Sequence, residues 1–271
     1  MPSPAEMTSK LDKESICMSI EEIGRPYVEE VYVLPEIAST NSYLLGQDIL
    51  PHKATICVAE SQLSGRGRRG NSWHSTPGKN ITLSISWGFA RWPETITGLG
   101  LAAALVIAER LNKDYQIKVQ IKWPNDLLVA GKKLAGILVD VSGESGGACN
   151  VVIGLGLNVE QAELATGQAS YALQDLNSLG VKLNRNQFIG ESTSDWVAML
   201  RAYEQNGFAP LVERWNRLSS YANSSITVGE GTAQITGEML GVDERGALLV
   251  KSKDGEVHVF ADSNVSVRLV N

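Results

Sequence analysis

The chain has 271 residues, of which 43% are hydrophobic, and a formal net charge of −6. This length can bury a substantial core and leaves room for a small second domain. The acidic balance excludes a broad electrostatic surface for DNA, RNA or an anionic membrane, so any anion-binding role must be local. The cysteines Cys17, Cys57 and Cys149 are too few and too scattered for a disulfide framework or a thiolate metal site.

The N-terminal segment carries no sign of export. Residues 1–4 lack the basic start that precedes the apolar run of a secretion signal. The most apolar stretch, Leu99 to Ala108, is too short to cross a bilayer, so we expect a cytoplasmic protein without membrane contact. Residues 1–28 are polar and lack sustained periodicity, and we expect a loose, partly disordered lead-in with one short helix.

The next segments read as strands that enclose a short helix. Val31–Pro35 and Thr55–Ser61 are β-branched and apolar, as strands are, and Ser39 supplies N-cap chemistry for a helix that runs to Leu45. Asn80–Trp87 alternates between apolar and polar residues, which predicts a half-buried strand. Its apolar face carries Ile81, Leu83, Ile85 and Trp87.

The middle of the chain continues this mixture of helices and strands. Thr95–Asn112 is rich in alanine and leucine and is long enough for a core helix. Ile117–Lys122, Lys133–Val141 and Asn150–Val159 read as further strands, and residues 186–217 carry helical signals. We therefore expect an α+β domain, with a mixed sheet packed on helices, over residues 29–222.

The sequence pattern changes from helical to strand-like after Asn223. Short strand-like runs then alternate with glycine-containing turns, which is typical of a small β-barrel. These runs are Ala233–Leu240, Ala247–Lys251, Val257–Ala261 and Val265–Val270. The pattern predicts a separate C-terminal domain over residues 223–271.

A glycine- and arginine-rich loop follows the second strand. Gly65, Gly67 and Gly70 spell G-x-G-x-x-G, but a dinucleotide fingerprint requires a helix after the last glycine, and loop residues follow here. Two interpretations remain open. The loop is either a solvated hairpin connection, or a lid in which guanidinium groups bind a carboxylate or phosphate while Trp73 covers an apolar part.

Two later strands carry glycines where side chains would otherwise pack. The strand that Lys133 opens contains Gly136, and the next strand carries Gly154 and Gly156 on one face. Glycine weakens a strand and often marks close approach of a ligand. The combination predicts a slot for a flat, mostly apolar ligand.

Together these segments resemble the bacterial biotin protein ligases, in the monofunctional form that lacks an N-terminal DNA-binding domain. The motifs occur in the order and spacing of that family, and the resemblance extends from Val31 to the C-terminus. The motifs are Ser39-Thr40-Asn41, Gln62 to Gly70, Lys122-Trp123-Pro124-Asn125-Asp126, Gly131 to Leu138 and Gly154 to Asn158. The family implies a catalytic domain followed by an SH3-like C-terminal domain.

The resemblance also implies a two-step reaction. The carboxylate of biotin attacks the α-phosphorus of ATP, with Mg²⁺ as cofactor, and gives biotinyl-5′-AMP and pyrophosphate. A lysine of the biotin carboxyl carrier protein of acetyl-CoA carboxylase then attacks the acyl carbon and releases AMP. Relatives dimerise through a sheet edge, and for this chain both a monomer and a homodimer remain open.

The resemblance assigns roles to individual residues. It makes Lys133 and Arg68 the catalytic residues. The expected biotin-binding residues are Ser39, Thr40, Asn41, Gln62, Arg66, Gly67, Arg68, Trp73, Lys133, Gly136, Leu138, Gly154 and Gly156. The expected nucleotide-binding residues are Arg68, Arg69, Asn125, Asp126, Lys133 and Asn158, with Asp126 also expected at the magnesium ion.

The chain departs from the family in a few places. About 30 residues precede the first strand, which three helices of ordinary length would fill, so we expect no sequence-specific DNA binding. Asn71 stands where some relatives carry a basic residue, and Glu160 to Leu173, expected over the adenine, matches no motif. The alternative functions are lipoate ligation or octanoyl transfer on a related fold, or a nucleic-acid-binding module that uses the arginine loop.

Overall fold

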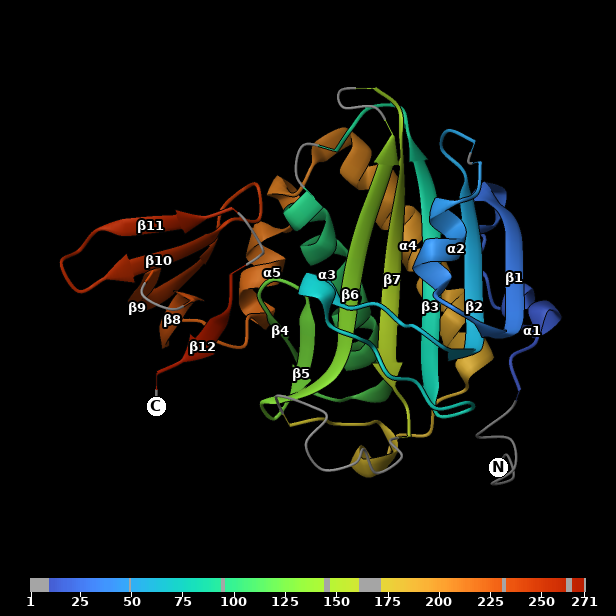
Figure 1. Ribbon diagram of the computed structural model, residues 1–271, viewed down its shortest axis with the longest axis horizontal. Helices are drawn as coiled ribbons and strands as arrows, with labels where there is room; N and C mark the ends of the chain where they lie inside the picture. Colours follow the sequence, from blue (N-terminus) through green and yellow to red (C-terminus); the bar gives the residue numbers. More distant parts are fainter. Residues whose placement is uncertain are drawn as a thin grey trace.

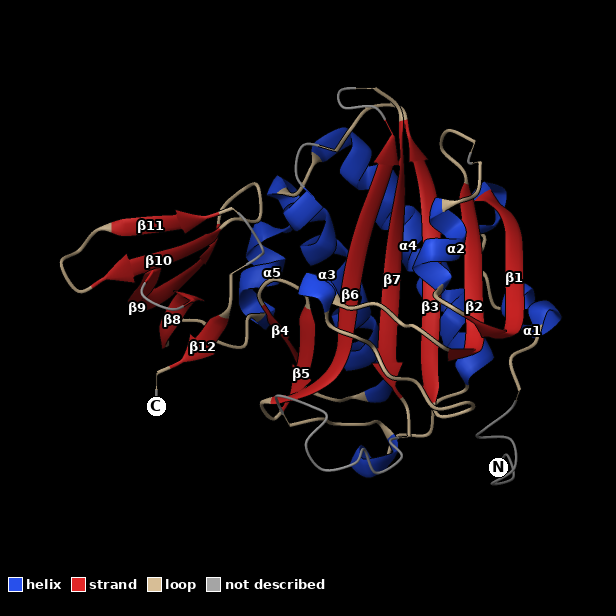
Figure 2. Ribbon diagram, in the orientation of Figure 1, coloured by secondary structure: helices blue, strands red, loops and turns tan. Residues whose placement is uncertain are grey.

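The computed structural model describes residues 10–48, 50–93, 96–143, 147–160, 172–230, 233–261 and 265–270. A seven-stranded mixed sheet packs on helices, and a five-stranded antiparallel sheet forms the C-terminal part of the molecule (Figures 1 and 2). This arrangement confirms the α+β class that the sequence predicts. None of the described helices is long and apolar enough to cross a membrane.

The large sheet has the strand order β1-β2-β3-β7-β6-β5-β4. β1 and β2 are parallel, and every other neighbouring pair is antiparallel. The strands are β1 (Val28–Ile37), β2 (Ala54–Gln62), β3 (Asn80–Phe89), β4 (Val119–Lys122), β5 (Asp126–Val129), β6 (Lys132–Gly143) and β7 (Cys149–Asn158). Pro35 lies in β1, at the edge of the sheet, where a residue without a backbone N–H is tolerated.

Helices cover both faces of this sheet. Two long helices lie behind it in Figure 1, and a short helix lies on the opposite face, over β2, β3 and β7. The helices are α1 (Lys13–Met18), α2 (Thr40–Leu45), α3 (Ile96–Tyr115), α4 (Arg185–Asn206) and α5 (Val212–Leu218). The helical signal over 186–217 is therefore divided into α4 and α5, because Gly207 has a positive φ of 62° and Pro210 follows it.

Successive residues of β3 face opposite sides of the large sheet. Ile81, Leu83 and Ile85 join the large apolar cluster under α3 and α4. Ser84, between them in sequence, is fully buried on the side of α2 and contacts two α2 residues. The sheet therefore presents small polar groups to the side on which α2 begins.

Residues 10–27 do not form the loose lead-in that their polarity predicts. Leu11, Ile16 and Ile20 are buried in the main core, and α1 packs on α4. The N-cap of α1 is Asp12, whose side chain accepts from the backbone N–H of Ser15 at 2.8 Å. Three spaced apolar residues in a short segment leave no recognisable period, so only their distant partners reveal this packing.

Two further differences are strands that the sequence analysis missed, one in each sheet: β5 (Asp126–Val129) and β8 (Ser225–Glu230). Trp123 to Asn125 form the turn between β4 and β5, with a cis bond before Pro124. The C-terminal sheet has the order β11-β10-β9-β8-β12. Its strands are β8 (Ser225–Glu230), β9 (Ala233–Val242), β10 (Leu248–Ser252), β11 (Val257–Phe260) and β12 (Val267–Leu269).

Candidate functional site

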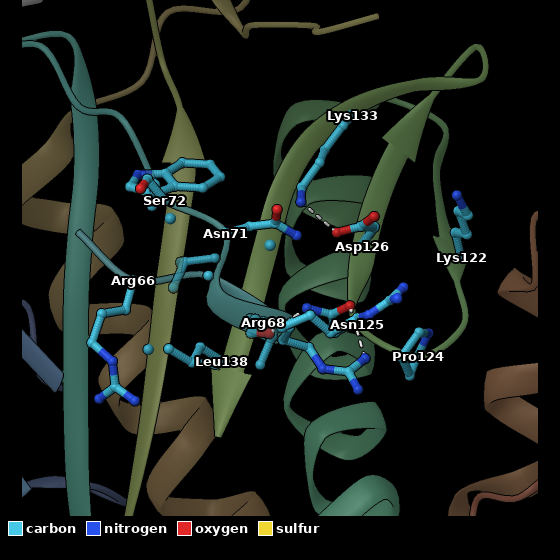
Figure 3. Close-up of a pocket in the computed structure, with 18 of the residues that line it drawn as sticks. Arg66, Arg68, Asn71, Ser72, Lys122, Pro124, Asn125, Asp126, Lys133 and Leu138 are labelled. Carbon is cyan, nitrogen blue, oxygen red and sulfur yellow. Dashed lines mark hydrogen bonds and ion pairs between the residues drawn. The ribbon is translucent and has the colours of Figure 1, made fainter. Parts of the chain in front are cut away.

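A cavity of about 770 Å³ lies where the arginine loop, the glycine-bearing strands and the C-terminal sheet meet. Figure 3 shows the part of its lining that the loop, the β4–β5 turn and β6 supply. It gathers nearly all of the residues that the sequence analysis selected. These are Ser39, Thr40, Asn41, Gln62, Arg66, Gly67, Arg68, Arg69, Trp73, Asn125, Asp126, Lys133, Gly136, Leu138, Gly154 and Gly156. The motifs are far apart in the chain but converge on one pocket.

Lys133 projects into the cavity because β6 is irregular at that point. In a regular strand, residues 133 and 136 would face opposite sides of the sheet. The register between β5 and β6 shifts so that Leu127 pairs with Ala135 and Leu128 with Lys133, which is a bulge. The side chain of Lys133 consequently runs over Gly136, where a Cβ would lie 3.2 Å from Lys133 Cε.

The ammonium group of Lys133 has an acidic partner in the cavity. Lys133 Nζ lies 2.6 Å from Asp126 Oδ1, and the two side chains point toward one another in Figure 3. Both side chains are largely buried, with 12% and 19% exposure. The same Nζ lies 5.9 Å from the centre of the Trp73 ring, within reach of a cation–π interaction.

The arginine loop is folded against the sheet. Within the loop, the N–H of Gly67 donates to the Asn71 carbonyl at 2.7 Å, and the N–H of Trp73 donates to the Gly65 carbonyl at 2.8 Å. Arg68 Nη1 donates to Asn125 Oδ1 at 3.3 Å (Figure 3). These contacts hold the loop together and tie it to the turn between β4 and β5.

Arg66 anchors the loop at a second place. Its two terminal nitrogens donate to the carboxylate of Asp140, on β6, at 3.2 and 3.1 Å. Such a forked pair fixes the direction of the guanidinium as well as its position. Asp140 was not among the predicted site residues.

The side chains of Asn41 and Trp73 lie against the face of β7 that carries Gly154 and Gly156. A Cβ at Gly154 would overlap Asn41 Oδ1, and a Cβ at Gly156 would overlap the indole of Trp73. Trp73 Nε1 is buried and has no hydrogen-bond partner among the described residues. The glycines leave space beside the strands, and in this structure Asn41 and Trp73 occupy it.

The start of α2 places polar groups at the inner end of the cavity. Ser39 is the N-cap, and its side chain accepts from the N–H of Ser42 at 3.4 Å. The next residue, Thr40, donates its backbone N–H to Gln62 Oε1 at 2.8 Å. Ser39, Thr40 and Asn41 are each at most 4% exposed, so a ligand that meets them is desolvated.

The sequence analysis placed one residue in the site that lies outside the cavity in this structure. Asn158 is buried, accepts from Asn80 Nδ2 at 3.2 Å, and donates to the carbonyl of Gln174 at 3.1 Å. It therefore holds the chain that returns after β7. Most of the segment expected over the adenine, residues 161–171, lies outside the described residues.

Other residues line the cavity without having been predicted. Lys122, Tyr221 and Arg268 all contribute, and Arg268 comes from β12 of the C-terminal sheet. Burial lowers the pKa of Lys122, an effect that the nearby Lys133 and Arg268 reinforce, while Asp126 opposes it. Lys122 could have been found from its place in the Lys-Trp-Pro-Asn-Asp motif, whereas no sequence signal marks Arg268.

The lining is strongly cationic although the protein is acidic. Arginine and lysine side chains line the cavity, and among the lining residues that the structure describes the only carboxylate belongs to Asp126. The positive residues are Arg66, Arg68, Arg69, Lys122, Lys133 and Arg268. A polyanion such as a nucleoside triphosphate fits this charge, with an apolar ligand portion against Trp73 and Leu138.

The described residues contain no cluster of three or more potential metal ligands. A magnesium ion is nevertheless commonly held by one or two carboxylates together with substrate phosphates. The carboxylate of Asp126 fits that mode.

Comparison with known proteins identifies relatives along most of the chain. The model of the Biotin/lipoate A/B protein ligase family matches residues 33–158, and that of the Biotin protein ligase C terminal domain matches residues 222–268. The Bifunctional ligase/repressor BirA of Escherichia coli (strain K12) is 37% identical over 238 residues, which are 88% of this chain and 74% of that protein. The Biotin--[acetyl-CoA-carboxylase] ligase of Paracoccus denitrificans is 30% identical over 206 residues, which cover 73% of this chain and 84% of that protein.

A solved structure shows the same fold. The biotin protein ligase from Aquifex aeolicus in complex with biotin and ATP superposes with a TM-score of 0.76 at 23% identity. The match covers 89% of this chain and 100% of that chain, so the catalytic and C-terminal parts are both represented.

Proposed function

Because the chain belongs to the biotin/lipoate A/B protein ligase family, we propose that it joins biotin to a lysine of a biotin carboxyl carrier protein through biotinyl-5′-AMP. The carrier belongs to acetyl-CoA carboxylase, as the names of the relatives indicate for those proteins. The observation that carries the proposal is the cavity itself. It joins a polar inner end, an apolar wall under Trp73 and a cationic wall around Lys133 in one continuous space.

In the first step, the carboxylate of biotin attacks the α-phosphorus of ATP and pyrophosphate leaves. Two anions must approach, so fixed positive charge lowers the barrier most effectively. Lys133 exchanges its contact with Asp126 for the carboxylate and an α-phosphate oxygen. Arg68 and Arg69 hold the phosphates, and Asn125 supports Arg68 from the turn after β4.

The inner end of the cavity holds the biotin head group. Ser39, Thr40 and Gln62 meet the ureido ring, and Asn41 supports them from the next position in α2. Trp73 and Leu138 enclose the thiophane ring and the valeryl chain, with Gly136, Gly154 and Gly156 leaving room for the strands to approach. Arg66 and Gly67 place the backbone of the loop over the head group.

In the second step, the amine of the carrier lysine attacks the acyl carbon and AMP leaves. The mixed anhydride hydrolyses if water reaches it, so a closed lid is needed until the carrier arrives. The arginine loop supplies that lid. Magnesium supplies charge neutralisation on the phosphates, and Asp126 is the residue that would hold it.

ATP–pyrophosphate exchange tests the proposal. The purified protein with Mg²⁺ should catalyse exchange with biotin and not with lipoate, octanoate or no acid, and Lys133→Ala should lower the rate by about a thousandfold or more. Exchange with lipoate alone would move the protein to the lipoate branch of the family. Exchange with none of the acids, from folded protein, would refute the ligase assignment.

A further inference from the structure

The backbone of Lys133 is held by a segment that lies outside the strands of the large sheet. The N–H of Lys133 donates to the Ala172 carbonyl at 2.9 Å, and the N–H of Gln174 donates to the Lys133 carbonyl at 2.8 Å. Leu173, between the two, forms a parallel β-bridge with Lys133. In Figure 1 this returning chain passes beside the start of β6. Both backbone hydrogen-bonding groups of Lys133 therefore bind one short segment, residues 172–174.

The strands beside β6 leave this place to the returning segment. β7 pairs with β6 from Ala135 onward and therefore does not reach Lys133. On the other side, the pairing with β5 shifts register between Leu127 and Leu128, so Lys133 lies in the bulge. A bulge disrupts the ladder of hydrogen bonds and bends the strand, so strand pairing alone fixes the direction of a side chain less well there. Residues 172–174 supply the backbone hydrogen bonds that the end of β7 does not.

Gln174 is itself fixed by a buried residue at the end of β7. Asn158 Nδ2 donates to the Gln174 carbonyl at 3.1 Å, and Asn158 Oδ1 accepts from Asn80 Nδ2 at 3.2 Å. Asn158 is 4% exposed, so water competes little for these hydrogen bonds. The two backbone groups of Gln174 thus connect Lys133 to a rigid part of the large sheet.

These hydrogen bonds determine where the ammonium group of Lys133 lies. Two bonds to one residue fix its backbone, and the backbone sets the direction of the Cα–Cβ bond. From that bond the side chain runs over Gly136 and brings Nζ to 2.6 Å from Asp126 Oδ1. A rotated backbone would place the charge elsewhere in the cavity. A misplacement of about 1 Å at a reacting centre costs up to about a hundredfold in rate.

We propose that Gln174 is a positioning residue, whose backbone N–H holds the bulge at Lys133 so that Nζ faces the reacting carboxylate and phosphate. The inference deepens the proposed function, on which it rests. Gln174 is not among the described residues that line the cavity, so it acts through Lys133 and not on a substrate. Its side-chain amide donates to the carbonyl of Asp175 at 3.3 Å, so the contact with Lys133 belongs to the backbone.

Two substitutions at position 174 separate the backbone N–H from the side chain. Gln174→Pro removes the N–H that donates to Lys133, and Leu173, in its β-bridge, has the extended backbone that a following proline accepts. Gln174→Ala removes the same side chain and keeps the N–H, which makes it the matched control. Rapid-quench measurements at saturating biotin and ATP give the rate of biotinyl-5′-AMP formation in a single turnover. Gln174→Pro should lower this rate about tenfold or more, and Gln174→Ala no more than about twofold.

A double-mutant cycle with Lys133→Ala determines whether the effect passes through Lys133. Without the ammonium group, the direction of the backbone at residue 133 no longer affects the reaction. Gln174→Pro should therefore lower the residual rate of Lys133→Ala by no more than about twofold. A tenfold loss in both backgrounds would overturn the inference and leave Gln174 a general structural residue. Equal rates for Gln174→Pro and Gln174→Ala would overturn it as well.

Thermal melts establish that each variant is folded, and hydrogen exchange of the wild-type protein provides a measurement that needs no variant. The N–H groups of Lys133 and Gln174 should both be protected from exchange, since each is bonded within the protein. Rapid exchange at Gln174 would overturn the inference. A wild-type protein in which both groups are protected but which forms no adenylate from biotin would instead refute the proposed function, and the inference with it.

Discussion

The Glu60→Gln substitution removes a carboxylate that joins several distant segments. Glu60, at the end of β2, accepts from both terminal nitrogens of Arg185 at 2.7 and 3.1 Å. It also accepts from the backbone N–H of Leu11 at 2.7 Å and of Gly78 at 3.2 Å. The N-terminal segment, the end of the arginine loop and the start of α4 are thus held by one side chain.

The burial of the Glu60–Arg185 ion pair determines how much stability Glu60→Gln removes. The side chain of Arg185 is 1% exposed and that of Glu60 is 14% exposed, so solvent screens the pair only weakly. Removing one partner of a buried ion pair destabilises a protein by about 3–5 kcal/mol. At roughly 2–4 °C per kcal/mol for a chain of this size, the melting temperature should fall by about 6–20 °C.

The pH dependence gives a second signature. Burial by itself would raise the pKa of Glu60, but the hydrogen bonds from Arg185 and from the two backbone N–H groups bring it below its ordinary value. A lowered pKa in the folded state means that the stabilisation is complete above the ordinary pKa and is lost as the pH falls through the lowered one. Glu60→Gln should lack this part of the acid-induced loss of stability.

Urea denaturation and thermal melts of the wild type, Glu60→Gln, Arg185→Met and the double variant measure the effect. The double variant should be more stable than the sum of the two single losses predicts, because it leaves no isolated charge behind. A Glu60→Gln protein within about 0.5 kcal/mol of the wild type would refute the reasoning. Strictly additive losses would show that the two side chains are not coupled.

Three further predictions concern the cavity and the core. Gly156→Ala should push the indole of Trp73 out of its slot and weaken biotin binding roughly tenfold, measured by calorimetry and tryptophan fluorescence. Gly46→Ala is the control, because its Cβ would lie 3.6 Å from the nearest atom. It should change neither the affinity for biotin nor the tryptophan fluorescence. Arg68→Gly should release adenylate, so that mass spectrometry finds biotin on many lysines; labelling confined to the carrier would contradict the lid. Burial raises the pKa of Cys57 to about 12, so a thiol reagent should label it only after unfolding.

Much of the fold could be read from local patterns. Three features depend only on neighbouring residues, and the structure confirms them. They are the alternation in β3, the N-cap at Ser39 and the alanine-rich helix α3. The errors lie where local pattern is weak. The short strand β5 and the packed segment around Ile16 depend on partners elsewhere in the chain.

In the candidate site too, sequence motifs mark some residues and only the packing of the sheets reveals others. Its motif residues could be chosen because their order and spacing resemble a family, and nearly all of them line one cavity. Arg268 was missed because it stands alone in a C-terminal strand and reaches the site only when the two sheets pack together. The bulge that turns Lys133 onto the face of Gly136 is likewise a property of strand pairing.

The sequence by itself determined the class of fold, the family and the chemistry available to the cavity, because residue types and spacing carry that information. Only the tertiary structure decided which groups meet. Asn41 and Asp140 are 99 residues apart, and Glu60 and Arg185 are 125 apart. Such pairs have no spacing rule, since the sheet order that joins them arises from the packing of the whole core.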